Sequence, residues 1–451
     1  MKIGKDINNV LVVGAFGKTG LATIQYLFKK KCMVKATDLI EEIPQEYKGM
    51  DVQWHLGEHN DKILENIDLI VLSPGVPSDI GLIQKARKSS IPVFSEIELA
   101  YQEFPRNWIG ITGTDGKSTT TALTGTILKQ GRKNVIVGGN IGEPLVEKLM
   151  NVPEDTVVVS ELSSFQLENI IDFKPFIGVL LNIAPDHMDR YHSMEDYIQA
   201  KMNLFSNQTE EDFAVLNYED PGSMSGQDRI RSKKYYFSRK KIPPCGCYLK
   251  KDEFFFKKGD AVEKVAQVSD MKISGEHNKE NTMAAITIAK LMELTDDQIR
   301  KGIKEFKGLE HRMELVAEIK GRKFINDSKA TTVSAVRMSV NSINDKGIVI
   351  MGGRDKGLDF SSLDPILKKK AKKIVLFGEA SEKIKSSLKF KEKIKVTTLE
   401  EAVHRSFNLS QKGDTILLSP GCASFDMFKN FEERGKTFKK IVMDLKKESE
   451  A

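Results

Sequence analysis

A glycine-rich turn near residue 113 combines the residue types that bind nucleotide phosphates. It reads Gly113-Thr-Asp-Gly116-Lys117-Ser118, after a short apolar run and before a helix-like run of apolar pairs. The two glycines can adopt backbone angles that other residues avoid, so N–H groups and a helix N-terminus can point at one anion. Lys117 adds a charge for the outer phosphates, and the Ser118 hydroxyl can bind Mg²⁺. The turn therefore predicts an ATP site.

This phosphate loop is shorter than the usual pattern, which has a glycine five residues before Gly116, where this chain has Ile111. An ordinary glycine turn before a helix would also explain the glycines, but Gly-Lys-Ser at a strand-to-helix junction favours a nucleotide. We predict ATP contacts at Gly113, Thr114, Asp115, Gly116, Lys117, Ser118 and Thr119.

Two later segments carry groups that bind metals. Glu161 directly follows an apolar run, and a carboxylate just past a core strand is well placed to hold Mg²⁺ beside phosphates. The next apolar run leads into Asn182-Ile-Ala-Pro-Asp-His187-Met-Asp189. A single histidine is more often structural, but His187 shares its turn with two aspartates. The two neighbouring carboxylates favour a metal or phosphate role for His187.

Residues 8–97 predict a small α/β domain with a second glycine turn, Gly14-Ala-Phe-Gly17-Lys-Thr-Gly20. A later strand-like run ends at Asp38, where a Rossmann-like unit would hold a ribose hydroxyl. The spacing is G-x-x-G-x-x-G and not G-x-G-x-x-G, so a tight turn without a ligand also fits. Ser73 follows the strand-like run Leu69–Leu72. Since open α/β sheets bind ligands beyond their carboxyl ends, Gly17, Asp38 and Ser73 could share one crevice.

The rest of the chain predicts two more domains. Residues 101–107, which include a proline, indicate a linker, and residues 210–270 contain short strand-like pieces without assigned chemistry. From about residue 308 a Rossmann-like alternation returns, with three polar clusters after strands that favour a ligand crevice: Asn326–Thr331, Gly352–Gly357 and Ser419–Ser424. We predict an α/β protein with a Rossmann-like domain (1–101), a central phosphate-loop domain (102–307) and a second Rossmann-like domain (308–451).

The composition is that of a soluble globular protein, with 451 residues, 40% hydrophobic and 29% charged. The apolar runs are strand-sized, and the N-terminus lacks the apolar core of a secretory signal. The four cysteines are scattered, which favours a reducing cytoplasm. The net charge of +6 is mild. We therefore expect a cytoplasmic monomer that binds neither nucleic acid nor membranes.

An ATP site, a candidate sugar-nucleotide or dinucleotide turn and substrate-sized polar loops favour a multi-substrate enzyme. ATP could activate a carboxylate as an acyl phosphate that an amine attacks, a reaction that needs Mg²⁺ and cations around the phosphoryl group. A phosphate-loop kinase is an alternative, but it would not need the loops of the third domain. An NAD-dependent oxidoreductase would leave the phosphate loop unexplained, and a nucleotide switch would ignore amino acids.

Six ordered motifs give the chain a resemblance to the bacterial Mur ligases over nearly its whole length. They are Gly113–Ser118, Ser160–Gln166, Asn182–Asp189, His311–Glu314, Asn326–Thr331 and Ala423–Asp426 with Asn430–Gly435. The Asp-Asn-Pro-Arg motif of the members that add diaminopimelate or lysine is absent, which favours the members that add D-glutamate. The resemblance implies an ATP-dependent ligase that joins D-glutamate to UDP-N-acetylmuramoyl-L-alanine through an acyl phosphate and a tetrahedral intermediate, in peptidoglycan precursor synthesis. A folylpolyglutamate-synthase-like ligase is the nearest alternative, but the first domain's loops favour the UDP-sugar.

The resemblance also implies roles at the reacting centre. Lys201, in Ala200-Lys-Met-Asn-Leu-Phe205, matches a lysine that family members carbamylate, which would give an anionic oxygen ligand for Mg²⁺. Without that motif, Lys201 would be taken for a surface lysine. The implied metal ligands, for two Mg²⁺ ions, are Ser118, Glu161, His187 and Lys201. The implied catalytic residues are Lys117, His187, Lys201 and Lys356.

Substrate contacts follow from the same resemblance. Beyond the phosphate loop, the implied nucleotide positions are Asn278, Asn281, Arg312 and Asp327. The implied D-glutamate positions are Thr331, Lys356, Ser424, Phe425 and Phe431. The implied UDP-sugar positions are Gly17, Thr19, Asp38, Ser73 and Asn140.

The chain departs from the family pattern at two places. Asp115 stands where the family usually has asparagine, and its carboxylate would repel phosphate unless Mg²⁺ or a neighbouring cation offsets it. We therefore expect a different ATP affinity or metal demand. The first glycine turn also has one residue more than the usual form, so the predicted uridine contacts would come from a longer turn than in other members of the family.

Overall fold

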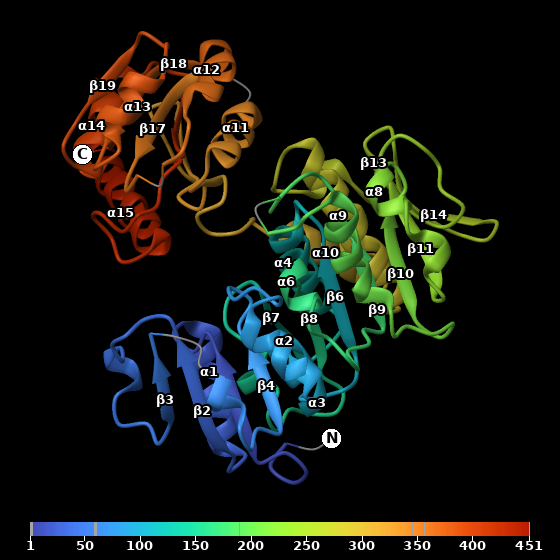
Figure 1. The fold of residues 1–451 in the computed structure, drawn as a ribbon. Coiled ribbons are helices and arrows are strands. Elements are labelled where there is room, and N and C mark those ends of the chain that lie inside the picture. The colour runs from blue at the N-terminus through green and yellow to red at the C-terminus, as the bar shows by residue number, and fades with distance from the viewer. Residues whose placement is uncertain (1–2, 58–60, 189, 344–345, 356, 451) are drawn as a thin grey trace. The chain divides into compact units, whose positions relative to one another are not determined.

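The structure is a computed structural model that describes residues 3–57, 61–188, 190–343, 346–355 and 357–450. The chain forms two compact units, Met1–Lys307 and Gly308–Ala451. The first unit contains two sheets and the second contains one, all with helices between the strands (Figure 1). The predicted α/β class is therefore confirmed. Among the described segments, no helix has both the length and the hydropathy that a membrane span requires.

A five-stranded parallel sheet begins the chain, and it is coloured blue in Figure 1. Its order is β3-β2-β1-β4-β5, so the direction of winding reverses between β1 and β4, where such sheets form a ligand crevice. The strands are β1 (Asn9–Val13), β2 (Met33–Asp38), β3 (Gln53–Leu56), β4 (Leu69–Leu72) and β5 (Val93–Phe94). The helices are α1 (Lys18–Lys29), α2 (Gly81–Lys88) and α3 (Glu96–Glu103).

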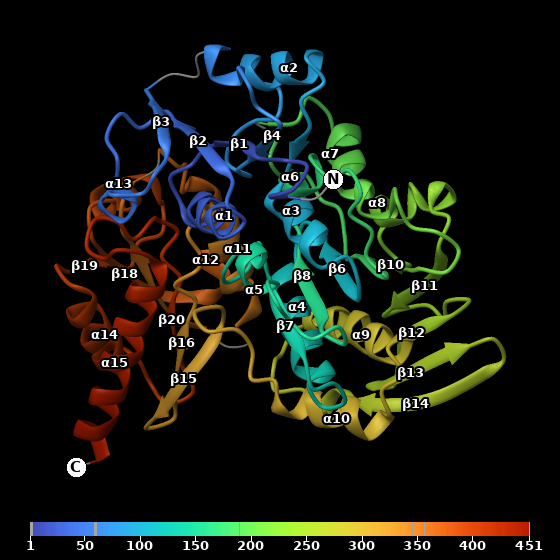
Figure 2. The same ribbon diagram turned by 90° about the horizontal axis from the view of Figure 1, so that it is seen from below.

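A nine-stranded sheet forms the rest of the first unit, in the order β14-β13-β12-β11-β10-β9-β6-β8-β7. Its strands are β6 (Trp108–Thr112), β7 (Val135–Gly139), β8 (Val157–Glu161), β9 (Ile177–Leu180), β10 (Phe213–Asn217), β11 (Lys233–Ser238), β12 (Gly246–Lys250), β13 (Glu253–Lys258) and β14 (Ala261–Gln267). Its helices are α4 (Lys117–Leu128), α5 (Leu145–Lys148), α6 (Ser164–Leu167), α7 (Met194–Met202), α8 (Pro221–Met224), α9 (Glu276–Leu291) and α10 (Asp296–Glu305). Helix α4, which follows the phosphate loop, packs against β7, β8 and α9 (Figure 2).

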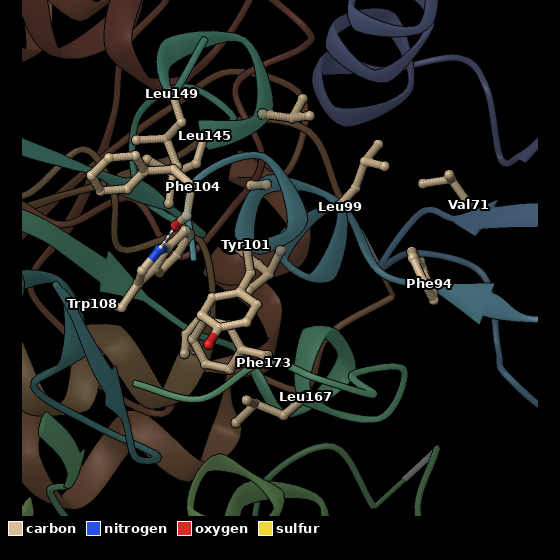
Figure 3. Close-up of a cluster of buried hydrophobic side chains, with 14 of the residues drawn as sticks. Val71, Phe94, Leu99, Tyr101, Phe104, Trp108, Leu145, Leu149, Leu167 and Phe173 are labelled. Carbon is tan, nitrogen blue, oxygen red and sulfur yellow. Dashed lines mark hydrogen bonds between the residues drawn. The ribbon is translucent and has the colours of Figure 1, made fainter. Parts of the chain in front are cut away.

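The segment predicted as a linker, residues 101–107, is buried at its aromatic positions and exposed at residues 105–107. Tyr101 belongs to the last turn of α3, and Tyr101, Phe104 and Trp108 are buried. The rings of Tyr101, Trp108 and Phe173 meet edge to face, with centroids 5.2 to 6.1 Å apart. Trp108 Nε1 donates a hydrogen bond to the Phe104 carbonyl at 2.6 Å (Figure 3). These aromatic side chains belong to one hydrophobic core that contains residues of both of the first two sheets.

The second unit is built on a six-stranded sheet in the order β15-β16-β20-β17-β18-β19. All of its pairs are parallel except β15 with β16. The strands are β15 (Glu314–Ile319), β16 (Arg322–Asn326), β17 (Gly347–Gly352), β18 (Ala371–Phe377), β19 (Lys393–Lys395) and β20 (Thr415–Leu418), and the helices are α11 (Val333–Ser342), α12 (Asp364–Lys370), α13 (Ser381–Ser387), α14 (Leu399–Leu409) and α15 (Phe431–Glu450). The three predicted polar clusters follow β16, β17 and β20, which are neighbours, so they lie at one edge of the sheet.

Candidate functional site

Three of the predicted motifs lie together at the carboxyl edge of the central sheet. Strand β6 runs between β8 and β9, with Ile111 beside Glu161 and Thr112 beside Leu180. The phosphate loop follows β6, Glu161 ends β8, and residues 182–190 follow β9. We call this last segment the His187 turn. The order of the strands therefore places the loop between a carboxylate and the turn that carries His187.

The phosphate loop has the backbone that an anion site requires. Gly113 has φ 153° and Gly116 has φ 84°, in the region that favours glycine. A Cβ atom on Gly116 would come 2.4 Å from Asn281 Oδ1, so the position has no room for a side chain. Helix α4 starts at the next residue, and its N-cap is Gly116, which has no side chain that could bind the first N–H groups. Its first N–H groups can therefore bind a phosphate.

The Lys117 side chain folds back over the loop. Its Nζ donates hydrogen bonds to the carbonyls of Gly113 and Thr114, each at 2.7 Å. The ammonium group thus lies within the loop that a phosphate would enter. Ser118 and Thr119, in the first turn of α4, are both buried.

Asn182 connects the phosphate loop to the His187 turn through hydrogen bonds. Its Oδ1 accepts from the Asp115 N–H at 2.8 Å, and its Nδ2 donates to the Asp115 carbonyl at 3.1 Å. The Thr114 hydroxyl also accepts from the Ala184 N–H at 3.0 Å. Sequence reasoning quoted Asn182 only as part of a motif and assigned it no role. Asn182 is the first polar residue after the strand, and this position could have indicated that it contacts the phosphate loop.

Lys201 is buried against the phosphate loop, so the alternative of a surface lysine is wrong. Its side chain is about 1% exposed, and its Nζ donates to the Gly113 carbonyl at 2.9 Å. The Nζ also lies 4.6 Å from the centre of the Tyr197 ring. Burial, and then the nearby charge of Lys117, lower the pKa of Lys201 to about 7, against opposing effects of Asp186 and Asp115. Lys201 is therefore neutral for a large part of the time near pH 7.

Glu161 has a carboxylate oxygen that is free to take a ligand. The side chain is buried, and its Oε1 accepts from Asn140 Nδ2 at 2.8 Å. Its Oε2 is also buried and has no hydrogen-bond partner among the described residues. A buried carboxylate oxygen without a partner is costly, and a bound cation would remove that cost. Asn140, predicted on the UDP-sugar side, thus contacts the predicted metal ligand.

His187 lies in a left-handed backbone conformation, with φ 56°. Its ring lies 4.8 Å from the Phe165 ring, centre to centre, and its Nε2 is 3.5 Å from Asp186 Oδ2. Its side chain is about half exposed, so a ligand can reach it. Asp189 lies outside the described residues.

The donor set suits Mg²⁺ bound together with a nucleotide. Within the described ranges, no three His, Cys, Asp or Glu side chains lie close enough to form a metal site of their own. Mg²⁺ usually takes one or two protein carboxylates and completes its shell with water and substrate phosphates. The free oxygen of Glu161, at the strand end next to the phosphate loop, fits that pattern. Ser118 and His187 could supply further ligands.

Asn278 and Asn281 lie on one face of α9. Asn281 Nδ2 donates to Asn278 Oδ1 at 3.0 Å, and Asn281 Oδ1 accepts from the Thr120 hydroxyl at 3.1 Å. Both asparagines therefore border the first turn of α4, where the predicted nucleotide would sit.

The predicted residues of the first sheet surround its glycine turn. Asp38 Oδ2 accepts from the Phe16 N–H at 2.9 Å, and the Ser73 hydroxyl donates to the Gly14 carbonyl at 2.7 Å. Gly17 has φ 142° and precedes α1, and Thr19 lies half-buried in the first turn of that helix. The structure thus brings these residues to one turn, at the point where the winding of the sheet reverses.

In the second unit, Arg434 contacts two of the predicted polar clusters, Asn326–Thr331 and Ser419–Ser424. Its side chain is fully buried, and its Nε donates to the Ser328 hydroxyl at 3.0 Å. Its Nη2 donates to the carbonyls of Ser328 at 2.9 Å and Cys422 at 3.2 Å, and its Nη1 donates to the Ala423 carbonyl at 3.3 Å. Burial lowers the pKa of Arg434 to about 10, so it stays charged at neutral pH. Sequence reasoning noticed Arg434 only inside a motif.

The other predicted residues of this unit are arranged around the same clusters. Asp327 is buried, and it accepts from the Met313 N–H at 3.1 Å and from the Ser339 hydroxyl. Burial raises the pKa of Asp327, and the nearby charge of Arg312 opposes this. The predicted D-glutamate residues range from buried to exposed: Ser424 is buried, Thr331 and Phe431 are half-buried, and Phe425 is about 60% exposed. Lys356 lies outside the described residues.

Known proteins resemble the chain over nearly its full length. Family models match at residues 8–95 (Mur ligase MurD-like, N-terminal domain), 111–289 (Mur ligase middle domain) and 311–422 (Mur ligase, glutamate ligase domain). A UDP-N-acetylmuramoylalanine–D-glutamate ligase of Caldanaerobacter subterraneus subsp. tengcongensis is 40% identical, covering 96% of this chain and 98% of the relative. The protein of the same name from Clostridioides difficile is 41% identical, covering 97% and 98%.

Solved structures show the same fold. The UDP-N-acetylmuramate-alanine ligase MurC of Thermotoga maritima aligns with a TM-score of 0.60 at 22% identity, covering 97% of this chain and 100% of that one. The resemblance predicted from six sequence motifs is confirmed by these comparisons, which span the three sheets. The chain belongs to the Mur ligase family, in the group that has a MurD-like N-terminal domain.

Proposed function

We propose that this chain is an ATP-dependent ligase that joins D-glutamate to UDP-N-acetylmuramoyl-L-alanine in peptidoglycan precursor synthesis. The observation that carries the proposal is the 40% identity to D-glutamate ligases over 96% of the chain. The site supports it, because a phosphate loop, a buried lysine and an unpartnered carboxylate oxygen lie at one sheet edge. A kinase or a nucleotide switch would not need the polar clusters that Arg434 holds together.

ATP would bind with its phosphates at the start of α4. The N–H groups of the loop and the Lys117 ammonium would stabilise the charge on the transferring phosphoryl group. Mg²⁺ when bound would neutralise phosphate charge and orient the phosphoryl group for in-line transfer. We assign Ser118, Glu161 and His187 as its protein ligands, with two ions in the full complex. Asn278, Asn281, Arg312 and Asp327 complete the proposed nucleotide contacts.

Lys201 would act as a carbamate. A neutral amine is needed for attack on CO₂, in which a C–N bond forms and the amine loses a proton. The lowered pKa of Lys201, caused mainly by burial, supplies that neutral amine near pH 7. The product is an anion next to Lys117, and its oxygens would join the metal ligands.

The reaction then needs two bond exchanges. The L-alanine carboxylate attacks the γ-phosphorus of ATP and ADP leaves, which gives an acyl phosphate. The amine of D-glutamate attacks the acyl carbon to form a tetrahedral intermediate, and phosphate leaves as the amide forms. We assign Gly17, Thr19, Asp38, Ser73 and Asn140 to the UDP-sugar, and Thr331, Lys356, Ser424, Phe425 and Phe431 to D-glutamate.

The proposed domains keep their predicted bounds: residues 1–101 would bind the UDP-sugar, residues 102–307 would bind ATP, and residues 308–451 would bind the amino acid. We further propose that the enzyme works in the cytoplasm as a monomer, on small molecules alone. Its small-molecule substrates would be the UDP-sugar and D-glutamate.

An isotope experiment tests the proposal. UDP-N-acetylmuramoyl-L-alanine labelled with ¹⁸O in the alanine carboxylate is incubated with ATP, Mg²⁺ and D-glutamate. We expect one ¹⁸O atom in each released phosphate and a nucleotide product heavier by one glutamyl residue. Phosphate without the label would contradict carboxylate activation, and activity only with a folate in place of the UDP-sugar would support the other ligase.

A further inference from the structure

Two charged side chains, Glu168 and Arg190, connect loops from the first two sheets. Glu168 Oε2 accepts hydrogen bonds from the Ser78 hydroxyl at 2.8 Å and from Arg190 Nη2 at 3.1 Å. Glu168 Oε1 accepts from the Tyr191 hydroxyl at 2.5 Å. The two charged side chains are only 14% and 15% exposed. The carboxylate is thus bonded on one side to the loop after β4 and on the other to the His187 turn.

Arg190 also binds the backbone next to Ser73. Its Nη1 donates to the Pro74 carbonyl at 2.8 Å, and its Nη2 donates to the Val76 carbonyl at 3.3 Å. We call residues 73–77 the Ser73 turn. The guanidinium is planar and rigid, so contacts to two carbonyls and one carboxylate fix its orientation. Arg190 therefore holds the Ser73 turn at a set distance from the His187 turn, to which it belongs.

The contacts continue from Arg190 to His187. The guanidinium carbon lies 3.9 Å from the centre of the Phe165 ring. The same ring lies 4.8 Å from the His187 ring, centre to centre. A continuous chain of packed groups thus runs from the Val76 carbonyl to the His187 imidazole. Networks in which each polar group has a partner are rigid, and the low exposure of this pair strengthens its bonds.

We infer that Glu168 and Arg190 are a positioning pair that sets the spacing between the Ser73 turn and the His187 turn. The inference rests on the proposed function, in which the first turn faces the UDP-sugar and the second faces the phosphoryl group. The pair makes no contact that the reaction itself needs. It aligns the carboxylate carried by the sugar nucleotide with the γ-phosphate, and misalignment of reacting atoms by 1 Å can cost about 100-fold in rate.

A positioning role separates turnover from binding. In the proposed function UDP alone would contact the first sheet and ADP alone would contact the phosphate loop, so neither ligand would need the spacing between the two turns. We expect Glu168→Gln and Arg190→Ala to lower kcat by about 10- to 100-fold at saturating substrates. We expect the dissociation constants of UDP and of ADP to change by less than about twofold, since neither site loses a contact.

The experiment compares the wild-type chain with Glu168→Gln, Arg190→Ala and the double variant. Phosphate release gives kcat, calorimetry gives the UDP and ADP affinities, and thermal unfolding reports the fold. Glu147→Gln is the matched control, because Glu147 of α5 pairs with Lys29 of α1 at 2.9 Å and so also joins the two sheets, away from both turns. The control should keep wild-type kcat.

The double variant separates positioning from a general loss of stability. If the two residues act as one unit, its kcat should equal that of the worse single variant. Unchanged kcat in the single variants, an equal loss in Glu147→Gln, or an ADP affinity that falls as much as kcat would overturn the positioning role. A wild-type chain that releases no phosphate with D-glutamate would overturn the proposed function as well, so the two failures are distinguishable.

Discussion

The Nζ atom of Lys201 lies 2.9 Å from the carbonyl oxygen of Gly113, so a buried lysine touches the phosphate loop directly. Their positions differ by 88 in the sequence, and α7 brings them together. A buried ammonium beside a second one is unfavourable, which is why the pKa of Lys201 falls to about 7. This contact connects the proposed carbamate to the proposed ATP site.

Activity should depend on the protonation of Lys201. Because the pKa is lowered, the amine is charged below about pH 7 and neutral above it. CO₂ reacts only with the neutral form, so carbamylation should rise as pH increases through 7 and fall about tenfold for each unit below it. Carbon-13 NMR with labelled CO₂ measures the carbamate at each pH.

Lys201→Ala should give no carbamate signal and should lose at least about 100-fold in kcat, and added carbonate should not restore the activity. Full activity in that variant would contradict the carbamate.

The phosphate-loop carboxylate should weaken ATP binding. Asp115 is exposed, and it belongs to the phosphate loop, whose Gly113 carbonyl Lys201 contacts. Asp115→Asn removes that negative charge, and we expect the KM for ATP to fall about threefold to fivefold at low Mg²⁺. The effect should shrink at high Mg²⁺, where the metal already offsets the carboxylate. Steady-state kinetics over a range of Mg²⁺ concentrations measures it, with Glu154→Gln as an exposed control. A KM that rises in Asp115→Asn would show that the carboxylate assists binding.

The Gly116 position should reject any side chain. A Cβ atom there would lie 2.4 Å from Asn281 Oδ1, at a φ of 84° that alanine rarely adopts. We expect Gly116→Ala to weaken ADP binding at least about tenfold, because the loop must shift. Adding Asn281→Ala removes the clash but not the backbone strain, so part of the affinity should return.

Gly259→Ala is the control for strain alone, since Gly259 has φ 60° and no atom within 4 Å of its Cβ position. Calorimetry with ADP compares the variants. Equal ADP affinities for wild type and Gly116→Ala would show that the loop does not bind the nucleotide in this conformation.

Arg434 should be needed for the stability of the second unit. Arg434→Met leaves the carbonyls of Ser328, Cys422 and Ala423 buried with fewer donors. We expect the free energy of unfolding to fall by about 3 kcal/mol, because buried acceptors without partners are costly. Denaturant unfolding measures it. Arg322→Met is the matched control, since Arg322 also donates to a carbonyl, that of Ser410, but is partly exposed. A smaller loss in Arg434→Met than in the control would contradict the role.

The features that the sequence predicted best are those that depend on neighbouring residues in the chain. Leu69–Leu72 is a continuous apolar run with a polar residue on each side, and it forms β4 at those residues. The glycine turns and Glu161 were predictable for the same reason, because each turn directly follows such a strand and Glu161 is the last residue of one. The family motifs then supplied roles that no pattern of spacing could provide.

What the sequence could not predict depends on contacts between distant segments. The burial of Lys201 follows from packing against a loop 88 positions away, and nothing in α7 indicates it. The Glu168–Arg190 pair joins two sheets, and Arg434 reaches back across 106 positions to Ser328. The aromatic residues at 101 and 104 looked like part of a linker, because hydrophobic residues without helix or strand periodicity give no sign of where they pack.

The most direct measurement is phosphate release from ATP and Mg²⁺ by the full chain with UDP-N-acetylmuramoyl-L-alanine and single amino acids of both chiralities. We expect release with D-glutamate and at most a trace with L-glutamate, together with a matching mass gain on the UDP-sugar. Release that is the same with and without D-glutamate, or that requires a different amino acid, would contradict the proposed ligase.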